Sequence, residues 1–238
     1  MKDIKLIDMH SHILPGADHG CSTASMSVQL IKKACDSGVE AVAATPHYYI
    51  HNKSVSDFLD KRERSYEKLM TAMEAEGLND IKIIKGAEVT IETDLMSCTT
   101  SDLRKLCYEN TDYILLEMPF IGWSDWVFKT IEAIKYRHGL NPVIAHIERY
   151  RDPSLDLLLE QDYIAQFNGD NAVGFLAKKR MIDMFESDTV HIMGSDLHDD
   201  KKRNYDGFIK ASAKLPSYML EKIYENSIAI LSNKALKR

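Results

Sequence analysis

Histidine and carboxylate side chains recur along this chain at the ends of short apolar segments, and a further histidine, His19, lies in the first loop. The residues at segment ends are His10, His12, His47, Glu88, Glu117, His146, Asp196 and His198. Imidazole and carboxylate ligands together suit zinc, manganese or iron. Two adjacent cations can clamp a phosphoryl group and activate a bound water. These residue types therefore favour metal-dependent phosphoryl chemistry.

The segments before these residues are short, β-branched or aromatic, as buried parallel strands tend to be. We expect strands at Ile4–Met9, Val39–Ala44, Ile81–Ala87, Tyr113–Glu117, Pro142–Ala145, Tyr163–Phe167 and Val190–Met193. Helical patterns lie at Met26–Asp36, Ser56–Glu76, Trp126–Arg137, Asn171–Phe185 and Pro216–Glu225. This alternation predicts an α/β fold with a parallel sheet, closed or nearly closed into a barrel. No linker or repeat interrupts it, so we expect one domain over residues 1–238.

The barrel prediction brings the polar residues together, because the carboxyl ends of parallel strands meet on one face. Each residue taken singly has a structural explanation. His47 after Pro46 could be a structural loop residue, and Glu117 could cap a neighbouring helix. Ligand-type residues after almost every strand are the stronger signal. The joint pattern therefore predicts one site that holds more than one metal ion.

Two arginines follow predicted ligands and could bind phosphate oxygens through paired hydrogen bonds. Arg149 lies three residues after His146, within the same loop. Arg203 follows His198 in a run of charged residues, and it could equally be an ordinary solvated side chain. We expect Arg149 to be the stronger phosphate ligand of the two.

Composition limits the class of protein. The net charge of -6 disfavours nucleic acid as a partner, since such binding needs a basic face. The cysteines Cys21, Cys35, Cys98 and Cys107 form no C-x-x-C pair, which favours reduced thiols in a cytoplasmic protein. The charged N-terminus predicts no signal peptide, and no apolar run is long enough to span a bilayer.

Several segments together resemble the PHP (polymerase and histidinol phosphatase) superfamily, and more narrowly the bacterial metal-dependent protein-tyrosine phosphatases of capsule and exopolysaccharide operons. The opening segment Ile7–Gly16 (IDMHSHILPG) carries the first motif. The others follow in the order of the family, at Ala44–His47, Gly86–Glu88, Leu115–Glu117, Pro142–Tyr150 and Ser195–His198. The resemblance covers nearly the whole chain.

This resemblance implies a distorted TIM-like (β/α)7 barrel of the PHP type with three divalent metal ions, manganese first, with iron or zinc as alternatives. It implies that the first ion is held by His10, His12, Glu88 and Asp196. The second would be held by Glu88, Glu117 and His146, and the third by His47 and His198. Arg149 and Arg203 fall at phosphate-binding positions. The implied substrate is a phosphotyrosine protein, a bacterial tyrosine kinase, with peripheral contact to that membrane kinase.

Two departures from the family pattern concern the third ion and the substrate. The family usually has two aspartates and a glycine in the first loop, whereas this chain has Asp18, His19 and Gly20. Either Asp18 or His19 could therefore be the ligand. After His47, the segment 48–51 (YYIH) has fewer basic residues than the family pattern predicts.

The predicted reaction is in-line hydrolysis by a metal-activated hydroxide, with Arg149 on the phosphoryl oxygens and His198 as one group that could protonate the leaving phenolate. A histidinol-phosphate or other small phosphomonoester phosphatase is one alternative, and a non-catalytic regulatory PHP module is another. Cys98 and Arg104 also satisfy the C-x5-R spacing of cysteine-based tyrosine phosphatases. That segment lacks glycine and contains Asp102, so we interpret the match as chance.

Overall fold

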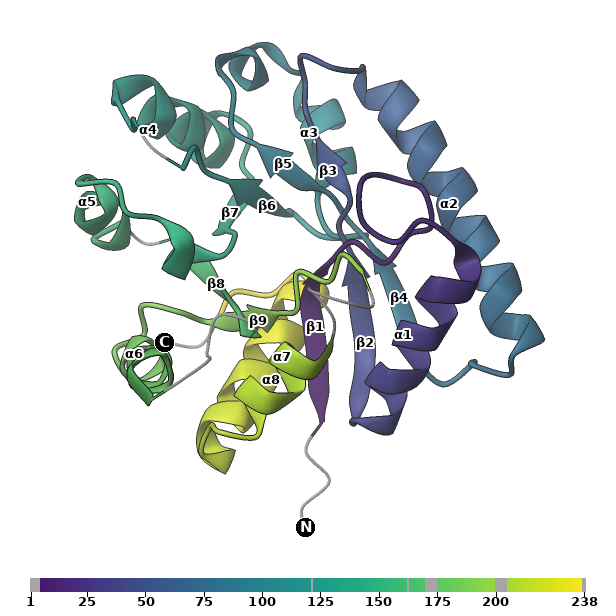
Figure 1. The fold of residues 1–238 in the computed structure, drawn as a ribbon. Helices are drawn as coiled ribbons and strands as arrows, with labels where there is room; N and C mark the ends of the chain where they lie inside the picture. Colours follow the sequence, from purple (N-terminus) through teal and green to yellow (C-terminus); the bar gives the residue numbers. More distant parts are fainter. Residues whose placement is uncertain (1–4, 121, 162, 170–174, 200–204, 237–238) are drawn as a thin grey trace.

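The computed structural model describes residues 5–120, 122–161, 163–169, 175–199 and 205–236. All of its paired strands are parallel, and they form two sheets with the orders β1-β2-β4 and β3-β5-β6-β7-β8-β9 (Figure 1). The strands are β1 Leu6–Ser11, β2 Val39–Ala44, β3 His47–Tyr48, β4 Lys82–Lys85, β5 Glu88–Thr90, β6 Tyr113–Glu117, β7 Asn141–Ile144, β8 Ile164–Asn168 and β9 Ile192–Gly194.

Two interrupted strands join the two sheets: β3 follows β2, and β5 follows β4, each after a short break. Pro46 has no N–H to donate, and it separates β2 from β3. The Gly86 N–H donates to the Ala44 carbonyl (2.9 Å), and the Glu88 N–H donates to the Pro46 carbonyl (3.1 Å). Hydrogen bonding therefore carries across the break, and β3 and β5 continue the paths of β2 and β4.

The segment after β9 also pairs with β1. The Asp196 N–H donates to the His10 carbonyl (2.8 Å), and the His12 N–H donates to the Leu197 carbonyl (2.8 Å). Ser11 and Leu197 form a parallel bridge. These bonds draw the edges of the parallel sheet towards each other, so the sheet is curled and its carboxyl ends face a common centre (Figure 1).

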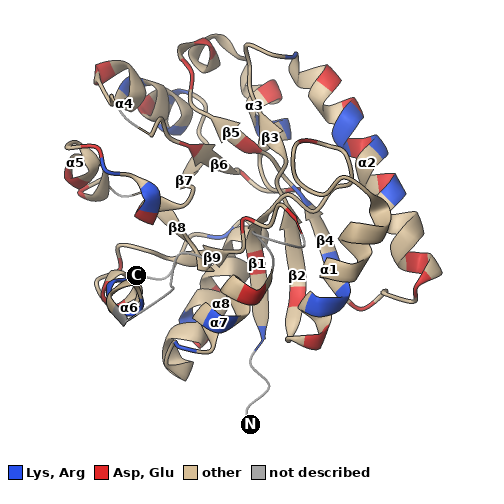
Figure 2. Cartoon of the chain, viewed as in Figure 1, with Lys and Arg blue, Asp and Glu red and all other residues tan. Residues whose placement is uncertain are grey.

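The helices lie around the outside of the curled sheet (Figure 1). They are α1 Ala24–Asp36, α2 Val55–Ala75, α3 Thr100–Leu106, α4 Asp125–Glu132, α5 Leu155–Leu159, α6 Phe175–Glu186, α7 Tyr205–Ser212 and α8 Ser217–Leu231, with a π-helical turn at Ala133–Arg137. Side-chain oxygens of Thr23 and Ser54 accept the backbone N–H bonds that begin α1 and α2. Both signs of charge alternate along the outer face of α2 (Figure 2).

Side chains on the two faces of the sheet build two hydrophobic clusters, as the alternation along a strand requires. The larger cluster lies between the strands and the outer helices. The smaller contains Met9, Ala43, Leu115 and Val143, which come from four strands, and Ile230 of α8. Apolar side chains therefore fill the middle of the fold, while polar residues gather at the carboxyl ends of the strands.

The expected parallel α/β architecture is confirmed, with corrections to individual elements. The first strand begins later and ends at Ser11, so His10 lies inside it rather than after it. Glu88 begins a separate short strand instead of following the third. The helices α3, α5 and α7 were not predicted, and the last helix reaches Leu231. The first four residues of the helix expected at Asn171–Phe185 lie outside the described residues.

Candidate metal centre

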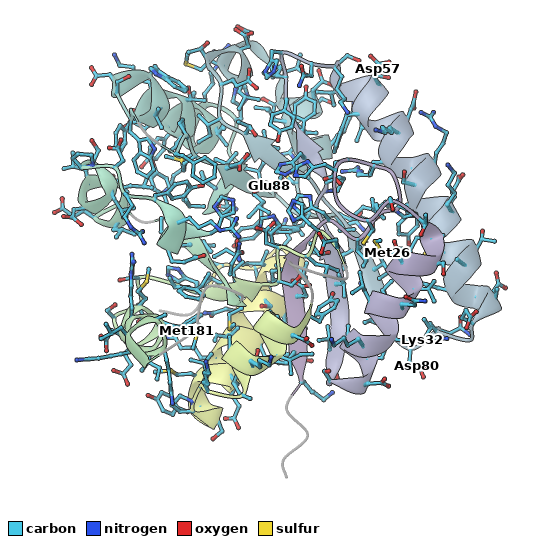
Figure 3. The ribbon with its side chains drawn as sticks, in the orientation of Figure 1. Met26, Lys32, Asp57, Asp80, Glu88 and Met181 are labelled. Carbon is cyan, nitrogen blue, oxygen red and sulfur yellow. The ribbon has the colours of Figure 1, made fainter. Side chains whose placement is uncertain are left out.

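Glu88 lies near the middle of the curled sheet, among nitrogen-bearing side chains (Figure 3). Its side chain is buried. Three imidazole nitrogens approach its Oε2 atom, from His10 Nε2 (3.2 Å), His12 Nε2 (3.2 Å) and His47 Nδ1 (3.0 Å). No hydrogen bond to this oxygen meets normal geometry within the described part of the chain. An unsatisfied buried carboxylate oxygen among imidazoles is the arrangement that a cation would complete.

Hydrogen bonds to the outer nitrogens orient the first two imidazoles. His10 Nδ1 lies 3.1 Å from Gln166 Oε1, and His12 Nδ1 lies 2.6 Å from Asp18 Oδ2. Because both partners are acceptors, each Nδ1 donates, and in the neutral imidazole each Nε2 carries the lone pair that could bind a cation. The Nε2 atoms of His10 and His12 lie 3.3 Å apart. Asp196 Oδ1 lies 3.2 Å from His12 Nε2. Convergent lone pairs beside carboxylates fit a divalent cation.

Glu117 and His146 lie on the other side of Glu88. His146 Nε2 is 2.9 Å from Glu88 Oε1 and 3.8 Å from Glu117 Oε1. Glu117 Oε2 lies 3.9 Å from His47 Nδ1 and accepts a hydrogen bond from Thr90. Burial, and then the negative charge of Glu88, raise the pKa of Glu117 to about 7. Added positive charge here would favour its ionised form.

A third group consists of imidazoles. His12, His47 and His198 each offer a nitrogen within 4.8 Å of the others. His198 Nδ1 donates to the Asp196 carbonyl (2.8 Å), which leaves its Nε2 facing His19 Nε2 at 3.1 Å. Asp18 lies elsewhere. Its carboxylate accepts from the Gly20 and His47 N–H groups and from His12 Nδ1, so it holds the loop rather than facing His198.

The electrostatics of the cluster also fit cations. Burial alone would raise the pKa values of Glu88 and Asp196, but the imidazoles, led by His10, hold both well below their usual range. Burial would likewise lower the pKa of His12, yet Asp18 and the other carboxylates raise it well above its usual value. Burial lowers the pKa of His47 to about 3. Glu88 and Asp196 are therefore ionised and can accept positive charge.

Close backbone approach explains two glycines in this centre. A Cβ on Gly20 would lie 2.4 Å from the Cβ of His12, and one on Gly194 would lie 2.5 Å from the Cβ of His10. Both distances are shorter than Cβ contacts allow. His146 and Asp196 have positive φ angles of 32° and 49°, which turn the chain sharply at the ends of β7 and β9.

Comparison with known families agrees with this arrangement. The family described as "Capsular polysaccharide synthesis, CpsB/CapC" matches residues 6–235. The chain belongs to this family. The resemblance to capsule-type phosphatases that the motifs predicted is therefore confirmed.

Named members of the CpsB/CapC group cover the chain almost end to end. It is 29% identical to the tyrosine-protein phosphatase YwqE of Bacillus subtilis (strain 168), over 98% of this chain and 94% of the relative. It is 24% identical to the putative tyrosine-protein phosphatase CapC of Staphylococcus aureus, over the same shares. A crystal structure from the work on YwqE of Bacillus subtilis and CpsB of Streptococcus pneumoniae, unique metal-dependent tyrosine phosphatases, superposes with a TM-score of 0.80 and 24% identity, covering 98% of this chain and 97% of that one. This superposition shows the shared fold.

Of the two predicted phosphate-binding arginines, the structure describes one. Arg149 Nη1 lies 2.6 Å from Asp196 Oδ2, and the Asn168 amide donates to the same oxygen (3.0 Å). The guanidinium therefore lies at the edge of the cluster and is partly exposed. Arg203 lies outside the described residues.

The Cys98 to Arg104 segment has none of the features of a phosphate-binding cysteine loop. Burial, and then Asp102 and Asp94, raise the pKa of the Cys98 thiol, which disfavours the nucleophilic thiolate. Arg104 Nε pairs with Asp112 Oδ1 at 2.7 Å. The matching spacing coincides with the start of α3, where Thr99 caps the helix.

Sequence reasoning missed the residues that support the cluster. Gln166 orients His10 and also accepts from the His146 N–H (2.9 Å). Asp8 accepts hydrogen bonds from Ser195 and Tyr205 beneath the site. The available signal was a polar residue inside an otherwise apolar strand, since such a residue needs a specific partner.

Among the described helices, none is both long and apolar enough to cross a membrane.

Proposed function

We propose that this chain is a metal-dependent protein-tyrosine phosphatase that hydrolyses phosphotyrosine on protein substrates. The observation that carries the proposal is the convergence of imidazole nitrogens on the Oε2 atom of Glu88, which accepts no hydrogen bond of normal geometry from any residue the structure describes. Family membership and the names of the relatives supply the substrate class. We also propose that the curled sheet is a distorted seven-unit barrel and that residues 1–238 form one domain.

The proposed cofactors are three divalent ions, with manganese as the first candidate and iron or zinc as alternatives. Their ligands would be His10, His12, Glu88 and Asp196 for the first, Glu88, Glu117 and His146 for the second, and His19, His47 and His198 for the third. The Nε2 atoms of His19 and His198, which face each other at 3.1 Å, support His19 as the ligand in place of Asp18. Asp18 instead orients His12 for the first ion.

When bound, such ions would neutralise phosphoryl oxygens and lower the pKa of a bound water. Arg149 would release one contact with Asp196 and bind a phosphoryl oxygen, with Arg203 as a second proposed phosphate ligand. His198 was expected either to bind metal or to protonate the leaving group. Its Nδ1 donates to the Asp196 carbonyl, so only Nε2 faces the site, which favours the ligand role.

The proposed substrate protein is a bacterial tyrosine kinase of capsule or exopolysaccharide synthesis, reached by peripheral contact with the membrane kinase from the cytoplasm. The family description supports the capsule context, and the name of the relative YwqE supports a phosphotyrosine substrate. The kinase and its location rest on the family resemblance of the motifs. The metal cluster would equally serve another phosphomonoester, so the substrate has to be tested directly.

The test compares release of phosphate from a phosphotyrosine peptide and from histidinol phosphate, with added manganese and after chelation. We expect chelator-sensitive release from the peptide alone. Glu88→Gln should abolish release and weaken manganese binding at the first two sites, whereas Asp125→Asn, whose carboxylate is 94% exposed, should behave as wild type. Preference for histidinol phosphate would refute the substrate, and peptide turnover that survives chelation would refute the metal centre. A chain that binds manganese but releases phosphate from neither ester would be a regulatory module.

A further inference from the structure

Phe120 is an exposed aromatic side chain beside the metal centre. It lies in the loop between β6 and α4 and is 53% exposed. Its ring stacks on the imidazole of His146, with centroids 6.2 Å apart and an interplanar angle of 5°. Tyr136 and Tyr218 are also exposed, but neither makes a ring contact with a histidine of the cluster in the described chain.

Hydrogen bonds anchor Met118, Pro119 and Trp123, which lie near Phe120 in the sequence. The Met118 N–H donates to the hydroxyl of buried Tyr150 (2.8 Å), and the Trp123 N–H donates to Asp152 (2.9 Å). The Trp123 indole also donates to the carbonyl of Pro119, within the same loop. Met118 and Trp123 are buried and anchor the chain near Phe120, whose ring is partly exposed. A single exposed apolar residue is ordinary, but Phe120 stacks on a proposed metal ligand.

We infer that Phe120 is the surface on which the aromatic ring of the substrate packs, and that it makes the site selective for aryl over alkyl phosphates. The inference rests on the proposed function, because it places the phosphoryl group at the cluster. His146 connects the carboxylate cluster to Phe120. Its Nε2 lies 3.8 Å from Glu117 Oε1, and its ring stacks on the ring of Phe120. The phenyl group of phosphotyrosine would extend outward from the cluster onto an aromatic face, a contact that phosphoserine lacks.

Tyr49 gives independent support for an aromatic rim. It is half-buried and stacks on His47 across the cluster, with centroids 5.4 Å apart and an interplanar angle of 22°. Aromatic rings therefore flank imidazoles on two different loops at the carboxyl ends of the strands.

The experiment measures binding of phenylphosphonate and methylphosphonate to the manganese-loaded protein by calorimetry, which needs no turnover. An aromatic contact of this kind is worth roughly a two- to tenfold change in affinity. We expect the wild type to prefer phenylphosphonate by about this factor. Phe120→Ala and Phe120→Leu should lose the preference, and Phe120→Trp should keep it. Tyr136→Ala, at a side chain that is 74% exposed, is the matched control.

The outcomes separate the two proposals. A phenyl preference that persists in Phe120→Ala, or none in the wild type, overturns the inference about Phe120. Equal weakening of both phosphonates would also overturn it, because that result indicates damage to the metal centre rather than loss of a ring contact. Failure of the wild type to hydrolyse phosphotyrosine peptide would instead overturn the proposed function.

Discussion

Replacing Asp18 with asparagine tests how the first loop prepares the metal centre. Asp18 Oδ2 accepts from His12 Nδ1 (2.6 Å) and from the His47 N–H (2.9 Å), while Oδ1 accepts from the Gly20 N–H (2.9 Å). Both oxygens are therefore acceptors, and the carboxylate is nearly buried. In Asp18→Asn, either orientation of the amide places an NH2 group against an existing N–H donor.

The expected size of the effect follows from these bonds. Loss of a carboxylate that orients a ligating imidazole typically weakens metal binding by about 10- to 100-fold. That corresponds to about 1.4–2.7 kcal/mol. The donor left without an acceptor adds a cost of about 1–3 kcal/mol to the metal-free fold. Asp18→Asn should therefore require more manganese for activity and should also unfold at a lower urea concentration.

The assay is activation of phosphotyrosine-peptide hydrolysis by manganese, titrated into metal-free protein, together with urea unfolding of that protein. Asp125→Asn changes the same functional group at an exposed site and serves as the control. An unchanged manganese midpoint in Asp18→Asn would refute the orienting role. A total loss of binding that added manganese cannot restore would indicate that Asp18 is itself a ligand.

Three further predictions concern the core and the rival mechanism. Tyr205→Phe removes a hydrogen bond of 2.9 Å to buried Asp8 and should lower the free energy of unfolding by about 1.5–3 kcal/mol in urea, whereas Tyr136→Phe should change it by less than about 0.5 kcal/mol. Cys98→Ser should leave peptide hydrolysis within about twofold of wild type. Loss of hydrolysis in this variant would support the cysteine mechanism instead. Burial lowers the pKa of His191 in the folded chain, so below about pH 6.5 the unfolded chain binds a proton that the folded chain does not. The contribution of His191 to the free energy of unfolding should therefore fall as the pH drops below about 6.5. His191→Gln should show a smaller loss between about pH 7 and pH 5.5 by urea unfolding, and an equal loss would contradict this assignment.

The positions of the proposed ligand residues were predictable because they depend on strand ends, which short apolar segments locate well. The breaks within the second and third strands were harder to predict, although Pro46 indicated the first of them. His47 and Glu88 consequently lie in short strands of their own, paired in register with each other. Local periodicity cannot show that a strand resumes after a break, because the resumed pairing depends on a neighbour distant in sequence.

The segment from Cys98 to Asp102 shows how a motif can mislead. Its C-x5-R spacing suggested a phosphate loop, yet the Thr99 hydroxyl accepts from the Asp102 N–H and donates to its carboxylate. These are the bonds of a helix N-terminus, and they begin α3. The T-x-x-D spacing is a helix-capping signal, although α3 was not among the predicted helices. A capping interpretation uses both polar residues, whereas the phosphatase interpretation leaves Asp102 beside the supposed anion site.

The choice between Asp18 and His19 depended on how the first loop folds. Gly20 allows the loop to pass against His12, and this close approach directs Asp18 to the imidazole Nδ1 and leaves His19 near His198. The third group then consists of imidazoles alone, whereas the group around Glu88 includes carboxylates. Manganese favours carboxylate oxygens more than zinc does. Under the proposed ligand assignment, the third ion would have no carboxylate ligand, whereas the first two ions would. The presence of His19 should therefore affect which metal binds at the third site more than it affects the first two.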